Sequence, residues 1–323
     1  MPDLPSGSKL SLAVKCLGSN LLPQVKDEPG EAAIAGTETH AKLEKYIEGG
    51  RKEPQDSSDS DRDLYRRVHA TTIRADTISE SAESLISVDA IRGVASVHDS
   101  AELGSIDRSE RFIAFADLIQ WNSDYEFSVW DWKTGGFAPS PEWNWQLILP
   151  GLCMYIMSGR DPRFRCTLAI LYTGQPTDDG KFKTDSATFG GDFFAKCESK
   201  LGFIQKQLKS SDPSTLKLYE GKHCGYCPAR ARCPAKAGAL LSAMGIIAEM
   251  NGENEILDED IVKASRFLID NKPQLDKAEK EILNRHGGQL NLGDGRIAVL
   301  EKKTSEKTGK TTEKVYTKHA TKA

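Results

Sequence analysis

Residues 111–136, RFIAFADLIQWNSDYEFSVWDWKTGG, predict two β-strands joined by a polar turn. Apolar residues dominate both halves, and residues 122–124, Asn-Ser-Asp, are typical of the turn between them. Acids stand where apolar residues are expected: Asp117 lies within the first strand and Asp131 within the second. Lys133 follows two residues later. This pair of strands is therefore the first place to look for a functional site.

The alternation of side chains along a strand assigns these residues to faces. Asp131 and Lys133 are expected on one face, with Trp130 and Trp132 on the other. If the two strands pair, Asp117 comes near Asp131, and two neighbouring carboxylates repel unless a cation lies between them. A divalent ion, usually Mg²⁺, held by carboxylate oxygens resolves that repulsion, and a lysine beside it can stabilise charge on a phosphate. The alternative is a surface hairpin with a solvated charged face.

Composition limits the class of protein. The chain has 323 residues, 38% of them hydrophobic, a net charge of −4 and a mean hydropathy of −0.47. This length suits one large or two modest domains, and the acidic total still permits a local basic groove. Without a long apolar run or a signal-peptide pattern, we expect a cytoplasmic protein with no membrane partner. Seven cysteines, an odd number, indicate thiols or metal ligands rather than a disulfide framework.

A helix is predicted upstream of the strand pair. Thr37, in the segment AGTETH, is expected to cap a helix that ends at Gly49 and Gly50. His40 falls in the first turn of this predicted helix, and Glu44 lies one turn later on the same face. A histidine in such a position is more often a surface residue than a ligand, so His40 is a candidate ligand only in combination with the other residues of the site.

The rest of the chain predicts further elements on both sides of the strand pair. The helices expected before the cysteine-rich segment cover residues 61–77, 143–159 (broken or kinked near Pro150) and 191–209. Strands are expected within 80–110 and at 164–173. Towards the C-terminus we expect helices over 235–250 and 257–286, a hairpin within 287–303 and a tail rich in lysine and threonine.

A cysteine-rich segment, HCGYCPARARCP, covers residues 223–234. Its three thiols belong to Cys224, Cys227 and Cys233. Glycine, proline and arginine are poor companions for buried core cysteines, so a metal site is the better interpretation. A closed site needs a fourth ligand, for which His223 and Cys16 are the candidates. The other three cysteines, Cys153, Cys166 and Cys197, lie in apolar runs and are expected in the core.

The order of these pieces resembles the RecB-type branch of the PD-(D/E)XK nuclease superfamily. The pieces are GTETH, an aspartate on a strand, the motif Asp-Trp-Lys on the next strand, a helix from Gln146 and a further strand. The cysteines resemble those of the iron–sulfur subclass, which includes CRISPR-associated RecB-like nucleases and the AddB nucleases. The layout is most similar to phage and prophage RecB-like exonucleases, and the resemblance covers about residues 10–235.

The resemblance implies roles for individual residues. His40, Asp117 and Asp131 would bind the metal, with the Trp132 carbonyl and Glu44 as possible additional ligands. Lys133 would be the catalytic lysine, and Gln146 would help to place the lysine or the DNA. The family usually has a tyrosine four residues after that glutamine, where this chain has Pro150; Tyr155 comes later.

The resemblance also implies that four cysteines, Cys16, Cys224, Cys227 and Cys233, hold a [4Fe–4S] cluster. Cys16 and Cys224 are about 200 residues apart, so a cluster joining them would close a long, entropically costly loop and act as a structural clasp. Zinc bound by three cysteines and His223 is the alternative. Arg230 and Arg232 beside the cluster are weak candidates for phosphate contacts, and two solvated surface arginines are the simpler reading.

We therefore expect an α/β fold with a mixed central sheet of about four or five strands, helices on both faces and a restriction-endonuclease-like core. Residues 1–235 would form the nuclease core with its iron–sulfur clasp, and 236–323 a helical appendage with a small β-hairpin and a basic tail. The expected activity is a Mg²⁺- or Mn²⁺-dependent DNA exonuclease in phage DNA recombination or processing, acting beside a phage single-strand annealing protein. The alternatives are a non-cleaving DNA- or partner-binding module on the same fold and a zinc-stapled structural protein.

Overall fold

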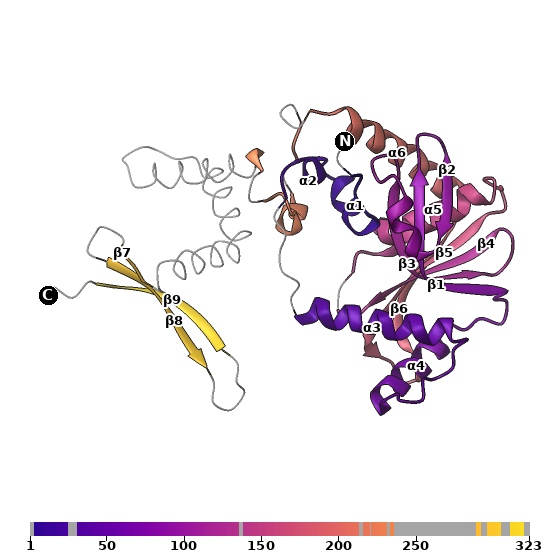
Figure 1. The fold of residues 1–323 in the computed structure, drawn as a ribbon, viewed down its shortest axis with the longest axis horizontal. Coiled ribbons are helices and arrows are strands. Elements are labelled where there is room, and N and C mark those ends of the chain that lie inside the picture. The colour runs from indigo at the N-terminus through magenta and orange to yellow at the C-terminus, as the bar shows by residue number, and fades with distance from the viewer. Residues whose placement is uncertain are drawn as a thin grey trace. The chain divides into compact units, whose positions relative to one another are not determined.

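The fold comes from a computed structural model and divides into two compact units, Met1–Cys233 and Pro234–Ala323 (Figure 1). The described residues are 3–24, 31–135, 138–212, 216–219, 221–230, 233–235, 289–291, 296–304 and 311–319. Apart from residue 235, the helices predicted over 235–250 and 257–286 fall outside these ranges.

The first unit is built on a six-stranded mixed sheet in the order β2-β1-β3-β4-β5-β6. Only β4 and β5 pair in parallel, and α5 (Trp145–Met157) connects them in the sequence, as a parallel pair requires. The strands are β1 (Ser79–Asp89), β2 (Val94–His98), β3 (Phe112–Trp121), β4 (Glu126–Lys133), β5 (Arg165–Pro176) and β6 (Phe182–Gly190).

The predicted mixed sheet with helices on both faces is confirmed, but it has six strands rather than four or five. The additional strand is β6, which the sequence analysis missed. β6 lies at the edge of the sheet and, after Phe182, exposes most of its residues fully or partly. A strand that buries so little apolar surface leaves only a weak hydrophobic pattern in the sequence.

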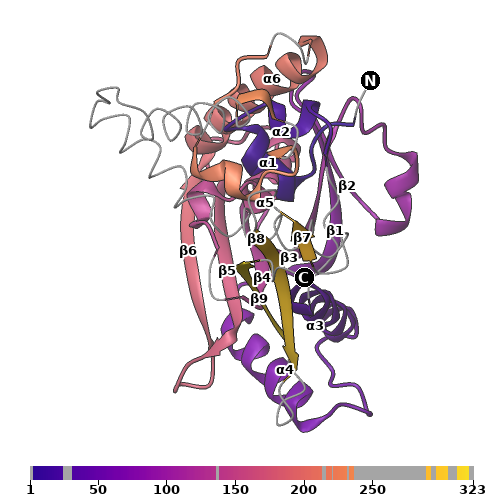
Figure 2. The ribbon, with the colours of Figure 1, turned by 90° about the vertical axis from the view of Figure 1, so that its left-hand side faces the viewer.

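One face of the sheet carries α1 (Gly7–Ala13), α2 (Gly18–Leu21), α5 and α6 (Gly191–Ser210), over the larger hydrophobic core (Figures 1 and 2). The helix predicted over 143–159 corresponds to α5, which continues through the buried Pro150. Since proline has no N–H, the carbonyl of Gln146 four residues earlier receives no helical hydrogen bond from it. Cys153, Cys166 and Cys197 are buried in this core, as predicted.

The opposite face is covered by α3 (Glu31–Glu48) and α4 (Asp59–Thr72). Tyr46 of α3 stacks on Tyr65 of α4 with ring centroids 4.7 Å apart. Trp130 and Trp132 of β4 are buried beneath these helices, so their predicted separation from the face of Asp131 and Lys133 is confirmed. Short 3₁₀ segments complete the unit: Ser100–Ser105, Pro141–Trp143 and Lys222–Tyr226.

A buried ion pair joins the end of α3 to the sheet. The Arg51 guanidinium donates two hydrogen bonds of 2.7 Å to the Glu80 carboxylate on β1, and its side chain is only 6% exposed. Arg51 also donates to the Thr72 hydroxyl, and Gln120 on β3 donates to Glu80. Burial alone would raise the pKa of Glu80, but the hydrogen bond and charge of Arg51 lower it overall from 4.5.

Replacing Glu80 with glutamine is expected to destabilise the first unit by about 3 kcal/mol, because Arg51 is left as a buried charge without its counter-ion. Denaturant unfolding measures this loss. The pKa of Glu80 is lowered in the folded state. Its contribution to the free energy of unfolding is therefore present above pH 4.5 and is lost as the pH falls through the folded pKa. The difference between wild type and variant should therefore shrink in acid. Asp179→Asn is the control, because it removes the negative charge from an exposed ion pair with Lys181. It should lower the free energy of unfolding by less than about 1 kcal/mol.

The second unit contains a three-stranded antiparallel sheet, with strands β7 (Gln289–Asn291), β8 (Arg296–Thr304) and β9 (Thr311–His319). β7 and β8 lie in the segment predicted as a hairpin, whereas β9 occupies the predicted tail. Threonine, valine and tyrosine in β9 favour a strand, and Glu301 lies opposite Lys314 across β8 and β9. Among the described residues, no helix has the length and apolar character that crossing a membrane requires.

Candidate metal centre

The centre lies where β3 and β4 separate. Their pairing extends to Leu118 and Trp130 and then stops, although β4 stays paired with β5 beyond this point. The next residues are Asp117 and Asp131. The Asp117 carboxylate accepts a 2.5 Å hydrogen bond from the backbone N–H of Trp132 through Oδ2. A side chain thus takes the place of a backbone partner of Trp132. Asp117 and Asp131, both buried, lie near each other where the strands separate.

A third acid, Glu83, lies beside them on β1. The pairs on either side of it, Ala82 with Leu118 and Ser84 with Ala116, place Glu83 opposite Asp117. Its φ of 44° is unusual for a residue with a side chain and carries a strain of about 1–3 kcal/mol.

The strand also changes face at Glu83. Ala82 packs in the core under α3 and α4, whereas Ile86 packs in the core under α5. Residues four apart share a face in a regular strand, so the alternation is interrupted between these two positions.

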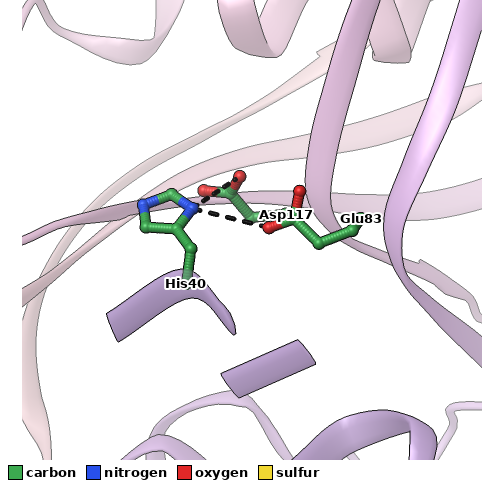
Figure 3. A group of neighbouring side chains, drawn as sticks. All are labelled: His40, Glu83 and Asp117. Carbon is green, nitrogen blue, oxygen red and sulfur yellow. Dashed lines mark ion pairs between the residues drawn. The ribbon is translucent and has the colours of Figure 1, made fainter. Parts of the chain in front are cut away.

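His40 reaches the acids from α3. Its Nδ1 lies 3.3 Å from Asp117 Oδ1 and 3.5 Å from Glu83 Oε1 (Figure 3), and its Nε2 lies 3.2 Å from the Trp132 carbonyl oxygen. The predicted cap at Thr37 is wrong: α3 begins at Glu31, and the Thr37 hydroxyl donates to the carbonyl of Ala33 within the helix. His40 therefore lies well inside the helix, where its backbone position is better fixed than in a first turn.

The two acids change the protonation of His40. Burial alone would lower the pKa of this imidazole, but hydrogen bonds to Asp117 and Glu83 and their negative charges raise it to about 10. The Nδ1 proton thus occupies a position between two carboxylates, where a cation is favourable. A metal ion at the same position would replace this proton.

Asp131, Lys133 and Gln146 form the other half of the centre. Both carboxylate oxygens of Asp131 lie 2.9 Å from Lys133 Nζ, and Nζ donates to Gln146 Oε1 at 3.2 Å. Burial and the charge of Asp117 raise the pKa of Asp131 above its usual range, while Lys133 opposes the rise. Gln146 is in the first turn of α5, where Asn144 accepts its backbone N–H. The lysine is thus held between a strand acid and a helix amide.

The chemistry of these side chains fits a divalent cation. One ligand atom from each of His40, Glu83 and Asp117 lies within 4.8 Å of the others, the only such group of three or more among the described residues. Glu83 Oε1 and Asp131 Oδ2 are buried and each has only an ion-pair contact, with His40 Nδ1 and Lys133 Nζ respectively, and no hydrogen bond of suitable geometry. A hard cation would supply the missing coordination of these buried carboxylate oxygens.

The structure thus brings most of the predicted ligands together. His40 and Asp117 are in contact, and Asp131 is near enough for Asp117 to raise its pKa. Glu44 lies near Glu83: burial, followed by the Glu83 charge, raises the pKa of Glu44. The Trp132 carbonyl faces His40 Nε2, whereas the two acids face Nδ1.

Sequence reasoning missed Glu83. The segment SESAESLISV alternates too irregularly to show which acid faces the site, because the strand changes face at this residue. Aligning β1 with β3 in the correct register would have identified Glu83, because it then lies directly opposite Asp117.

A cavity of about 440 Å³ opens beside the centre. On one side it is lined by α3, through Ala33, Gly36, Thr37 and His40. The remaining lining residues are Glu83, Trp132, Lys133, Thr134 and Gly135. The metal-facing groups and the lysine are therefore reachable from this cavity.

The cysteines predicted to form a cluster belong to one region. Cys227 packs with Leu22, Ala229, Leu218 and Cys233 in a small separate core. Burial raises the pKa of Cys227, a backbone hydrogen bond opposes this, and the charges of three nearby thiols, Cys224, Cys16 and Cys233, raise it further. The four sulfurs do not form a group as tight as that at His40. The buried Nε2 of His223 has no hydrogen-bond partner among the described residues.

Comparison with known proteins agrees with this geometry. The sequence model of the PD-(D/E)XK nuclease superfamily matches residues 16–234, a span that includes every residue of the candidate centre. No curated protein matches the chain. Nucleases of this superfamily use divalent metals, and the mixed sheet with flanking helices fits their restriction-endonuclease-like core. The chain belongs to the PD-(D/E)XK nuclease superfamily.

Proposed function

We propose that this protein is a metal-dependent DNA nuclease whose ion is held by His40, Glu83, Asp117 and Asp131. The observation that carries the proposal is the convergence of an imidazole and two carboxylates from separate elements, with Lys133 and Asp131 adjacent. Glu83 adds a ligand to the set expected from sequence. A bound Mg²⁺ or Mn²⁺ would activate water and neutralise charge on the scissile phosphate.

The protein's own residues orient the substrate and stabilise charge. Asp131 and Gln146 hold the Lys133 ammonium in place, so that it can donate a hydrogen bond to a phosphate oxygen without a large loss of side-chain entropy. Asp117 ties the backbone of Trp132 to the centre, which fixes Lys133 one residue later. His40 and Glu83 lie on the α3 side of the centre, where the His40 imidazole contacts the Glu83 carboxylate.

We further propose that Cys16, Cys224, Cys227 and Cys233 hold a [4Fe–4S] cluster that clasps the two ends of the core. Besides burial, the charges of the Cys224, Cys16 and Cys233 thiols raise the pKa of Cys227, which supports the proximity of the four cysteines. No three cysteine sulfurs lie within 4.8 Å of one another in the described part of the chain, so the choice of an iron–sulfur cluster over zinc rests on the resemblance of the cysteine pattern.

The finer activity proposed is that of a RecB/AddB-like exonuclease in phage DNA recombination or processing, working in the cytoplasm beside a single-strand annealing protein. Its support is the sequence resemblance, from the GTETH segment through the Asp-Trp-Lys motif to the cysteines.

Digestion of end-labelled linear DNA and closed circular DNA with Mg²⁺ or Mn²⁺ tests the proposal. We expect wild type to degrade linear DNA and to spare the circle, and Asp131→Asn to be inactive. Cleavage of the circle would replace the exonuclease assignment with an endonuclease. Equal degradation by wild type and Asp131→Asn would identify a contaminant and favour a non-cleaving DNA-binding module.

A further inference from the structure

We infer that Lys183, on the edge strand β6, binds a phosphate of the DNA backbone next to the phosphate at the metal centre. This inference rests on the proposed nuclease function and adds a substrate-binding residue two strands away from Lys133. The observation that carries it is a row of three residues across β4, β5 and β6, which runs from Lys133 through Tyr172 to Lys183.

The register of the strands defines this row. Lys133 is opposite Tyr172 in the parallel pair of β4 and β5, and Tyr172 is opposite Lys183 in the antiparallel pair of β5 and β6, the edge strand (Figure 2). Residues opposite each other on neighbouring strands share a face of the sheet. The backbones of the two lysines are two strand spacings apart, about 10 Å. Because each lysine has a flexible four-carbon stem, their ammonium groups can contact neighbouring phosphates of one DNA strand.

The burial of the adjacent residues agrees with this face. Leu171 and Phe182 each precede a member of the row in the sequence, and both pack in the core under α3 and α4. Tyr172 packs in the core under α5. Since side chains alternate along a strand, Lys183 lies on the same face as Tyr172.

Tyr172 supports the ammonium group without neutralising it. Lys183 is exposed, and its Nζ lies 5.6 Å from the centroid of the Tyr172 ring. Such a contact at an exposed site is worth only about 0.5–1 kcal/mol. In the described part of the chain no carboxylate oxygen lies within 4.0 Å of Lys183 Nζ, whereas Lys181 in the preceding turn is paired with Asp179 at 3.8 Å. Lys183 thus presents a positive charge that a phosphate can use.

The next row towards the middle of the sheet carries acids. Asp131 and Asp185 lie in it on either side of Ile170. Both rows act on Tyr172: burial raises the pKa of this phenol, the charges of Asp185 and Asp131 raise it further, and Lys133 opposes the rise. A phosphate is repelled by the acidic row, except where the metal ion neutralises it, and is attracted by the row of lysines. The DNA backbone is therefore directed along the lysine row, at the strand ends.

One neutral variant and two controls test this inference. Lys183→Gln removes the charge, and Lys183→Arg keeps it. Lys206→Gln makes the same loss of charge at an exposed lysine of α6 outside the row. Binding of the end-labelled linear DNA is measured in Ca²⁺ at several salt concentrations, cleavage is measured in Mg²⁺, and Mn²⁺ affinity is measured by electron paramagnetic resonance.

Lys183→Gln should weaken DNA binding at least fivefold. It should also reduce the slope of log K against log salt concentration by about 0.7–0.9, the value for one lost phosphate contact. Lys183 lies away from the reacting atoms, so its contact is the same in the ground state and the transition state. KM should therefore rise while kcat and Mn²⁺ affinity stay unchanged. Lys183→Arg and Lys206→Gln should both stay within twofold of wild type.

Three results would overturn the inference and leave the nuclease assignment intact. The first is a Lys183→Gln protein that matches Lys206→Gln in DNA affinity and salt slope. The second is a loss of Mn²⁺ affinity in Lys183→Gln, which would place the effect at the metal centre. The third is a Lys183→Arg protein that binds DNA as weakly as Lys183→Gln. Failure of wild type to cleave any DNA would overturn both the inference and the nuclease assignment.

Discussion

Replacing Asp117 with asparagine is expected to remove metal-dependent cleavage, lowering kcat/KM by about 10³-fold or more, since the metal supplies several kcal/mol of transition-state stabilisation. Mn²⁺ affinity should fall in parallel. Asp117 faces His40 through Oδ1 and accepts the Trp132 N–H through Oδ2. Asparagine keeps an oxygen for Trp132 and loses the negative charge, so the fold should survive while the cation loses a ligand. Steady-state cleavage and Mn²⁺ titration measure the two effects.

Asp124→Asn is the matched control, because it makes the same change at an exposed position in the turn of the same hairpin. It should leave both activity and Mn²⁺ affinity within twofold of wild type. An Asp117→Asn protein that folds and binds Mn²⁺ as tightly as wild type would show that the ion lies elsewhere.

Replacing Cys227 with serine is expected to release the cluster and to lower Tm by about 10–20 °C. Loop-closure arithmetic for a crosslink that joins residues 16 and 224 gives about 5 kcal/mol. For a domain of this size each kcal/mol shifts Tm by about 2–4 °C. The small core around Cys227, with Leu22 and Leu218, should loosen with it. Calorimetry measures Tm, and iron and acid-labile sulfide assays measure the cluster.

Cys197→Ala is the control for this prediction, because Cys197 is buried on α6 in the main core and should affect neither iron nor sulfide content. Stoichiometric zinc without iron in wild type would replace the cluster with a zinc clasp. Unchanged iron content in Cys227→Ser would contradict the ligand assignment.

Local patterns predicted the strands of the site well. The run around Asp117 and the segment with Asp131 and Lys133 form β3 and β4, and the tryptophans of β4 face the opposite core. Alternation in a strand is a local property, so it can be obtained from sequence alone.

Features that depend on neighbouring elements were not predicted. Glu83 enters the centre because β1 changes face there, and its position opposite Asp117 is set by the register of β1 with β3. The start of α3 was placed too late, because Thr37 has a capping side chain but lies within a helix begun by Glu31 and the alanines after it. β6 was missed because an edge strand buries little apolar surface.

The most direct test of the central claim is the position of the metal itself. Crystals soaked in Mn²⁺ and measured for anomalous scattering should show a peak about 2.0–2.6 Å from His40 Nδ1 and from carboxylate oxygens of Glu83, Asp117 and Asp131. Lys133 Nζ should lie beside the ion without binding it. A peak bound by other residues, or none between α3 and the separated ends of β3 and β4, would contradict the account.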